Sequence, residues 1–340
     1  MKEKLLGKSP EELSEVVLQA GLPSYAAGQL ARWMYVSRVH SFDEMSSISK
    51  AGRARLAELF DLGVDLPVAV SDSSDGTRKY LFAPQGSELE VEAVMIPDED
   101  RKTLCVSSQM GCKMACKFCM TGRQGFHGHL DTAQILSQFI GVDESIELTN
   151  TVFMGMGEPL DNTDNVLAAI KVLTAPWGFA WSPKRITLST IGILPNLKRY
   201  LDECRCHLAI SLHNPYPEQR FNFMPVQKAY DIRDIVALLK RYDWSGQRRL
   251  SFEYTMFAGW NDDAAHADAL IRLLKGLECR VNLIRFHSIP DFPYHSSEQR
   301  TMEAFRDRLS KHGITCTIRA SRGEDILAAC GLLAGQRRQG

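Results

Sequence analysis

The sequence contains no long run of apolar residues. No window approaches the roughly 18 continuous apolar residues that a membrane-spanning helix requires, so we expect no membrane partner. The first residues, MKEKLLGKSPEELSEVVLQAGL, are charged throughout and lack the apolar stretch of a signal peptide. Nine cysteines without a secretory signal are typical of a reducing compartment. We therefore expect a cytoplasmic protein whose cysteines bind metal, react or lie buried.

The chain also lacks an excess of charge of either sign. Its 40 Lys and Arg residues nearly balance 41 Asp and Glu residues, which leaves a formal net charge of -1. Bulk charge therefore neither indicates nor excludes a nucleic-acid partner, which would need a local basic patch. Internal repeats and low-complexity segments are absent as well. With 340 residues, 44% of them hydrophobic, the chain can form one large α/β domain and a smaller piece.

Residues 1–62 predict a small helical accessory domain. Ser9 is an N-cap candidate with Glu12 at the capping-box position, and apolar residues at helical spacing follow over 24–38 and 48–60. Its Arg and Lys residues suit either an RNA contact or a solvated surface. Residues 63–100 form a β-hairpin region, because RKYLFAP and LEVEAVMIP flank a QGSE turn at 85–88.

Strand and helix patterns alternate over residues 101–335. This alternation indicates parallel strands joined by crossover helices, and hence an α/β barrel or an open sheet. In a barrel, working residues gather at the carboxyl ends of the strands, where this sequence places small and polar residues. The strand candidates are TLCVSSQ, NTVFMGM, RITLSTIG, CHLAISLHN, LSFEYTMFAG, CRVNLIRFHS and TCTIRASRG.

The loop after the first of these strands holds three cysteines but no fourth. Cys112, Cys116 and Cys119 have C-x3-C-x2-C spacing in GCKMACKFCMTG. A structural zinc site closes with four ligands, so a zinc loop would have to borrow a distant one. An iron–sulfur cluster held by three thiolates would instead leave one iron open to a substrate. The position at a barrel mouth favours the cluster.

This spacing resembles the signature of radical S-adenosylmethionine (SAM) enzymes. The resemblance implies a partial (βα)6-type barrel with a 4Fe–4S cluster on Cys112, Cys116 and Cys119, whose open iron is chelated by SAM. GMGEP then looks like the strand end that receives the methionine amino group. The residues implied in SAM binding are Gly157, Glu158, Ser189, Ser211, Leu212, His213 and Asn282.

Two further cysteines indicate which family within the radical SAM enzymes the chain resembles. Cys105 stands in TLCVSSQMGC and Cys330 in SRGEDILAACGLLAG. Either alone would be read as a small buried residue. Together, LCVSSQ-GC---C-FC-TG and RG-DI-AACG resemble the RlmN/Cfr family of radical RNA methyltransferases. The similarity runs from about Glu92 to Gly335, and less sharply into the N-terminal helices and the hairpin. The other cysteines, Cys204, Cys206, Cys279 and Cys316, we interpret as core or incidental.

The resemblance implies a mechanism with two molecules of SAM. Cys330 would take a methyl group from the first, and a radical generated from the second would remove a hydrogen from that S-methyl group. The resulting methylene radical would add to adenine and tether the RNA. The adduct would then lose one electron and the ring proton, which Glu92 would accept, and Cys105 would attack the Cys330 sulfur, forming a transient disulfide and releasing the methylated base. The adenine must be unpaired or flipped out of its stack.

The resemblance leaves the target carbon to be chosen between two branches. RlmN enzymes methylate carbon 2 of adenosine 2503 in 23S rRNA, in its naked precursor form, and adenosine 37 of tRNA. Cfr enzymes methylate carbon 8 of the same rRNA adenine. The Arg in IRASRGEDILAACG favours RlmN, whereas LSTIGILP and SLHNPYPEQR look more like Cfr. An electron donor such as flavodoxin is implied for either branch.

Two alternatives belong to other classes of protein. One is a radical SAM enzyme that acts on a peptide or a small molecule. The other is a non-catalytic RNA-binding protein with an iron–sulfur or zinc site. Neither would need both Cys105 and Cys330, so this pair of thiols distinguishes the alternatives.

Overall fold

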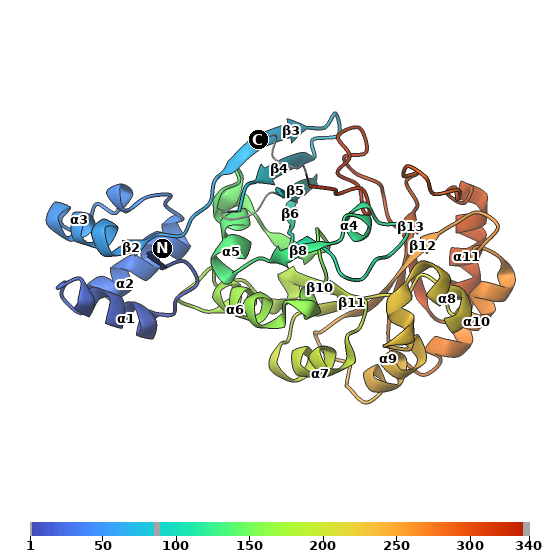
Figure 1. Ribbon diagram of the computed structural model, residues 1–340. Coiled ribbons are helices and arrows are strands. Elements are labelled where there is room, and N and C mark those ends of the chain that lie inside the picture. Colours follow the sequence, from blue (N-terminus) through green and yellow to red (C-terminus); the bar gives the residue numbers. More distant parts are fainter. Residues whose placement is uncertain (1, 85–88, 336–340) are drawn as a thin grey trace.

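The computed structural model describes residues 2–84 and 89–335. A small, mainly helical part at the N-terminus is joined by an extended segment to a larger α/β part (Figure 1). The small part contains β1 (Glu3–Lys4), α1 (Pro10–Gln19), α2 (Ala26–Ala31), a π-helix (Arg32–Ser37), a 3-10 turn (Phe42–Glu44), α3 (Lys50–Leu59) and β2 (Phe60–Asp61).

The predicted capping box at the start of α1 is confirmed. The Ser9 hydroxyl accepts a hydrogen bond from the Glu12 amide, and the Glu12 carboxylate accepts one from the Ser9 amide at 2.7 Å. Two features were not predicted. The second helical segment widens into the π-helix, and β1 pairs in parallel with β2. Strands of two residues are too short to show a period-2 pattern.

The predicted hairpin is confirmed as β4 (Arg78–Phe82) and β5 (Val91–Asp98), which pair antiparallel. The expected QGSE turn at 85–88 lies outside the described residues. A further antiparallel strand, β3 (Pro67–Asp72), pairs with β4. Its side chains are mostly exposed, so the alternation of apolar and polar residues that marks a half-buried strand is missing.

The larger part is built on a 10-stranded sheet in the order β14-β13-β12-β11-β10-β9-β6-β5-β4-β3. From β6 to β14 neighbouring strands are parallel, as the alternating pattern predicted, and the row continues past a sixth strand to β14. These strands are β6 (Arg101–Cys105), β9 (Asn150–Phe153), β10 (Ile186–Thr190), β11 (His207–Ser211), β12 (Leu250–Met256), β13 (Arg280–Arg285) and β14 (Thr315–Ile318).

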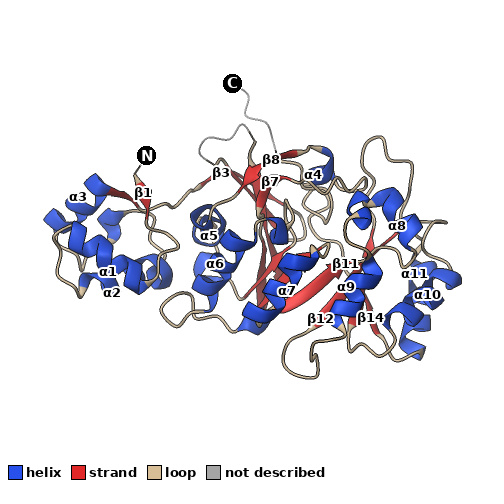
Figure 2. Ribbon diagram, turned by 60° about the horizontal axis from the view of Figure 1, so that its bottom comes forward, coloured by secondary structure: helices blue, strands red, loops and turns tan. Residues whose placement is uncertain are grey.

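Helices cover the outside of the curved parallel sheet (Figure 2). The sheet presents apolar side chains such as Leu188, Ile210 and Phe252 to them, all 0% exposed. The helices of the larger part are α4 (Met120–Arg123), α5 (Thr132–Ile140), α6 (Thr163–Thr174), α7 (Leu194–Glu203), α8 (Pro217–Phe223), α9 (Ile232–Leu239), α10 (Ala264–Leu274) and α11 (Gln299–Lys311). It also contains 3-10 turns at Ser145–Glu147, Pro159–Asp161, Pro183–Arg185 and Pro225–Lys228. No helix in the described ranges has the length and apolarity to span a membrane. This arrangement confirms the expected partial barrel.

A short antiparallel pair interrupts the alternation. β7 (Gln109–Gly111) and β8 (Phe126–His129) pair with each other and lie on either side of the three-cysteine loop along the chain. This pair was not predicted. The predicted strand TLCVSSQ ends at Gln109, the first residue of β7, and a strand of three residues is too short to show a period-2 pattern. The pair fixes both ends of the loop.

Candidate active site

The three-cysteine loop is held by its own backbone. Cys112 follows β7, and its amide donates to the Gly125 carbonyl at 2.8 Å. The Cys119 amide donates to the Cys116 carbonyl at 3.1 Å, and a Cβ on Gly122 would come within 2.9 Å of the Cys116 nitrogen. The loop therefore folds tightly back on itself between β7 and α4.

The three thiols of this loop lie in one another's electrostatic field. Burial, followed by neighbouring charges that include the other thiols, raises the pKa of Cys112 to about 12 and that of Cys116 well above its ordinary value. In the described part of the chain, no three His, Cys, Asp or Glu side chains lie close enough to hold a single metal ion. Three soft donors in one loop, with Cys112 buried and Cys116 and Cys119 partly buried, are chemically suited to an iron–sulfur cluster.

The strand end after β9 packs closely against the segment between β6 and the loop. Gly157 has φ +97°, and a Cβ there would come within 2.5 Å of the Gln109 Cβ. A Cβ on Gly155 would come within 2.7 Å of the Val106 carbonyl. Both positions require glycine, so the backbone of GMGEP is exposed to close approach by a neighbouring group.

Gly157→Ala should therefore disrupt this strand end. The left-handed backbone alone costs an alanine about 1–2 kcal/mol, and the contact with Gln109 must displace the chain as well. We expect a lower unfolding temperature and little SAM cleavage. Gly276→Ala is the matched control, because Gly276 has φ +79° and a Cβ added there would meet nothing within 4 Å. Equal SAM cleavage by the two variants would show that the close packing is not required.

Glu158 joins the ends of two neighbouring strands. Its carboxylate accepts hydrogen bonds from the Thr190 hydroxyl at 2.5 Å and from the Ile191 amide at 2.9 Å, just after β10. Burial raises the pKa of Glu158 to about 7. The predicted role of this carboxylate as acceptor for a ligand amino group remains a prediction, and its observed role is to hold these strand ends together.

His213 lies against the three-cysteine loop. Its ring contacts that of Phe118 edge-on, with 5.0 Å between centroids, and Phe118 stands between Cys116 and Cys119. The His213 Nδ1 accepts a hydrogen bond from the Thr255 amide at 3.0 Å, and burial lowers the pKa of His213 to about 3. The ring is therefore neutral, and its proton is on Nε2.

The other predicted residues on β10 and β11 lie at the same carboxyl edge. Ser189 is half-buried near the end of β10, and Ser211 ends β11. The carbonyls of Ser211 and Leu212 accept hydrogen bonds from the buried Arg220 side chain at 2.9 and 3.0 Å. Arg220 was missed by the sequence reasoning. It fixes the backbone on which Leu212 and His213 lie.

A cavity of about 700 Å³ inside the barrel brings the predicted cysteine pair together with Asn282. Buried Cys105 ends β6, whereas exposed Cys330 stands in the loop after β14. Burial and then the Cys330 thiol raise the pKa of Cys105 to about 12. The two thiols are therefore neighbours in space despite their separation in sequence.

Glu253 and Arg319 line the same cavity and were also missed. Glu253 accepts a hydrogen bond from the Asn282 amide at 2.8 Å, and its Oε2 lies 3.6 Å from the Arg319 guanidinium. The charge of the Cys330 thiol, when ionised, raises the pKa of Arg319. A signal for both was present in the sequence. Glu253 is a charged residue inside the apolar strand LSFEYTMF, and Arg319 is a charged residue directly after the strand TCTI.

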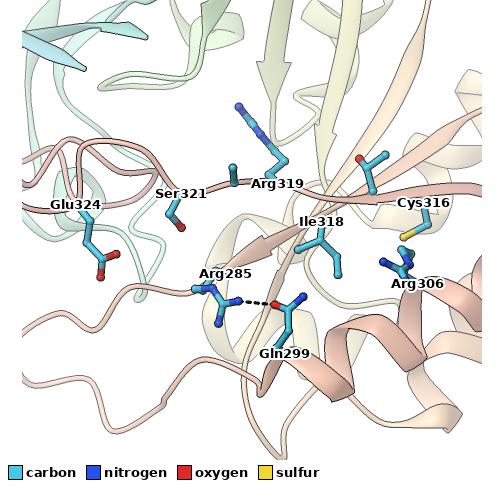
Figure 3. A pocket seen from close by; sticks show the side chains of 10 residues that line it. Arg285, Gln299, Arg306, Cys316, Ile318, Arg319, Ser321 and Glu324 are labelled. Atoms are coloured by element: carbon cyan, nitrogen blue, oxygen red, sulfur yellow. Dashed lines mark hydrogen bonds between the residues drawn. The ribbon is translucent and has the colours of Figure 1, made fainter. Parts of the chain in front are cut away.

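A second hollow, of about 570 Å³, lies at the outer edge of β14. There Arg285 donates a hydrogen bond to Gln299, while Arg319 points away from them both (Figure 3). This hollow contains Cys316 but neither Cys105 nor Cys330. The predicted reactive pair belongs to the barrel interior alone.

Hydrogen bonds tie the Cys330 loop to the cysteine loop. The Met120 amide donates to the Gly331 carbonyl at 2.9 Å, and the Thr121 hydroxyl donates to the Leu333 carbonyl at 2.6 Å. Because Met120 follows Cys119 directly, Cys330 is fixed beside the end of the three-cysteine loop. The Cys330 thiol also raises the pKa of Cys119, after burial.

Glu92 supports the same loop from the other side. Its carboxylate is buried, pairs with Lys79 at 3.1 Å and accepts hydrogen bonds from the Ala334 and Gly335 amides at 3.0 and 3.4 Å. The structure therefore shows Glu92 anchoring the chain that follows Cys330. Its predicted role as proton acceptor remains a prediction.

Known proteins resemble the chain over almost its full length. Residues 3–62 match the model of the ribosomal RNA large subunit methyltransferase N-terminal domain, and residues 106–270 match the radical SAM superfamily. A Porphyromonas gingivalis protein named as a probable dual-specificity RNA methyltransferase RlmN is 57% identical over 335 residues, 98% of each chain. The chain belongs to the RlmN family of radical SAM methyltransferases.

More distant relatives agree with this membership. The dual-specificity RNA methyltransferase RlmN of Syntrophus aciditrophicus is 42% identical over 332 residues, 96% of this chain and 95% of the relative. A crystal structure of a radical SAM methyltransferase from Sphaerobacter thermophilus superposes with a TM-score of 0.93 at 36% identity, covering 97% of this chain and 99% of that one.

Membership in this family implies a 4Fe–4S cluster and SAM. The structure offers a donor set that fits both. The three thiols of the loop suit the cluster. The buried Glu253 Oε2 has no hydrogen-bond partner among the described residues, so a polar acceptor is left for a ligand inside the barrel.

Proposed function

We propose that the chain methylates carbon 2 of adenine in RNA, at adenosine 2503 of 23S rRNA and adenosine 37 of tRNA, through an S-methylated Cys330. The observation that carries the proposal is the pairing of Cys105 and Cys330 in one cavity beside the three-cysteine loop. A non-catalytic RNA-binding protein, or a radical enzyme acting on a peptide, would have no use for this pair.

In this proposal the cofactor site lies at the carboxyl edge of the sheet. Cys112, Cys116 and Cys119 hold the cluster, and Gly157, Glu158, Ser189, Ser211, Leu212, His213 and Asn282 surround SAM. When bound, the cluster and SAM supply a radical able to remove a hydrogen atom from a methyl group. Partly buried Phe118 and buried His213, whose rings contact each other, limit the access of water there.

Cys330 is the methyl carrier. As a thiolate it is a good nucleophile, and it displaces S-adenosylhomocysteine from SAM as it takes the methyl group. Its exposure leaves it open to both SAM and an RNA base. Two elements hold the loop steady, because Met120 and Thr121 bind it on one side and Glu92 binds it on the other.

Cys105 is the resolving thiol. Its burial raises its pKa to about 12, so it is protonated at neutral pH and must give up its proton when it reacts. It then attacks the Cys330 sulfur, and the disulfide that forms must be reduced before the next turnover. Arg319 opposes the effect of burial, because its positive charge lowers the pKa of Cys105.

The choice of carbon 2 over carbon 8 is supported by the names of the relatives. The relatives from Porphyromonas gingivalis and Syntrophus aciditrophicus are both named as dual-specificity RNA methyltransferases RlmN, the first as a probable one. Their similarity to this chain extends over almost its full length. We accordingly propose 23S rRNA and tRNA as substrates, an electron donor of the flavodoxin class, and the cytoplasm as the place of action.

Nucleoside mass spectrometry tests the proposal. Anaerobically reconstituted protein is incubated with unmodified rRNA and tRNA, a reductant and methyl-labelled SAM. We expect labelled 2-methyladenosine from both RNA pools. Labelled 8-methyladenosine would move the chain to Cfr-type chemistry with the same residues. If SAM is cleaved but no labelled adenosine forms, the proposal that RNA is the substrate is refuted.

A further inference from the structure

The opposite end of the barrel carries a set of basic side chains that the methyl-transfer reaction does not use. Four of the seven parallel strands that the structure describes, β6, β10, β12 and β13, have an arginine at or just before their start that lines the central cavity: Arg101, Arg185, Arg249 and Arg280. Lys184 and His207 line the same region. In barrels of this kind the interior is ordinarily packed with bulky branched apolar side chains. Here the mouth is cationic.

Most of these cations have no carboxylate partner among the described residues. Arg101 pairs with Asp98 at 2.7 Å. Within residues 2–84 and 89–335, no ion pair involves Lys184, Arg185, Arg249 or Arg280. All four are exposed at the mouth, so their charged groups can reach a ligand from solvent. An ordinary surface of a protein with net charge -1 would be expected to intersperse acidic residues among them.

The positive charges of these basic groups lower the pKa values of their neighbours. Burial, followed by the charges of Arg280 and Arg101, lowers the pKa of Arg249. Burial, followed by Arg249 and Lys184, lowers the pKa of His207 to about 4. The His207 Nδ1 accepts a hydrogen bond from the Arg249 amide at 2.9 Å, so the neutral ring carries its proton on Nε2. The mouth therefore holds many donors and unbalanced positive charge.

We propose that Arg185, Arg249 and Arg280, together with His207, bind an oxyanion of the phosphate class at the amino end of the barrel. The planar guanidinium presents paired N–H groups that match two oxygens of a phosphate. The site lies at the amino end of the same cavity that Cys105 and Cys330 line, and Arg249, just before β12, is four residues from Glu253, roughly 13 Å along an extended chain. The phosphate comes either from a free phosphate compound or from the backbone of bound RNA.

Thermal unfolding of the full-length reconstituted protein tests the site. Inorganic phosphate is titrated at constant ionic strength with chloride as the replaced anion. We expect a saturable rise of a few degrees in the unfolding temperature of the unchanged protein. The Arg249→Gln/Arg280→Gln variant should lose the rise. Without phosphate it should unfold at or above the original temperature, because mutual repulsion is removed.

The matched control is Arg241→Gln/Arg272→Gln, which removes the same charge from exposed positions outside the cavity. It should keep the rise. An equal response to phosphate in both double variants, or no saturable response in the unchanged protein, would overturn the site.

Binding of a single-stranded RNA oligonucleotide separates the two sources of phosphate. If RNA supplies the phosphate, Arg249→Gln/Arg280→Gln should weaken RNA binding by about tenfold relative to the control, and inorganic phosphate should compete. If the ligand is free phosphate, RNA affinity should stay the same while the thermal response is lost. Neither measurement involves methylation, so the result is independent of the proposed reaction.

Discussion

Cys330→Ala is expected to abolish RNA methylation while leaving the iron–sulfur absorbance of the reconstituted protein intact. The alanine has no sulfur to accept a methyl group, so the loss should exceed about a thousandfold and reach the detection limit. The fold should be unaffected, because Cys330 is exposed and its loop is held by the backbone of Gly331 and by Leu333. Methylated nucleosides and the visible spectrum are measured on the same sample.

The control for this variant is Cys279→Ala. Cys279 is also a free cysteine, but it lies beside the amino end of β13 and lines neither of the two hollows beside β14. It should methylate normally. Normal turnover by Cys330→Ala would refute the carrier role, and a lost cluster signal would instead assign Cys330 a structural role.

Cys105→Ala is expected to trap the enzyme on its RNA. The covalent link would form at Cys330, but no thiol would be near enough to break it by disulfide formation. Nearly all of the active enzyme should then run as a protein–RNA species that survives denaturant on a gel. Product release should fall to background. The expected cost to folding is small, about 1 kcal/mol, because only the sulfur of a buried side chain is removed.

Two further variants make this result specific. Cys316→Ala removes a buried cysteine from β14, as Cys105→Ala does from β6, and should give no crosslink. Cys105→Ala/Cys330→Ala should give none either, because the carrier is absent. A crosslink that persists in the double variant would place the link on another residue. Absence of a crosslink in Cys105→Ala would exclude Cys105 as the resolving thiol.

Much of the fold could be predicted because its signals are local. Alternating strand and helix patterns located every parallel strand from β6 to β14, and Ser9 with Glu12 marked the start of α1. The misses, such as β3, β7 and the π-helix, lack such a signal. β3 is mostly exposed, β7 has only three residues, and the π-helix differs from an α-helix only in its hydrogen-bond register.

The sequence by itself determined the chemistry that is available. The spacing of Cys112, Cys116 and Cys119 and the presence of Cys105 and Cys330 could be read directly from the chain. Only the tertiary structure decided which of these groups meet. Cys105 and Cys330 line one cavity because β6 and the loop after β14 converge on it. The same convergence placed Glu253 and Arg319 at the site and gathered the arginines at the opposite mouth. Such meetings depend on strand register and curvature, which no local pattern of residues encodes.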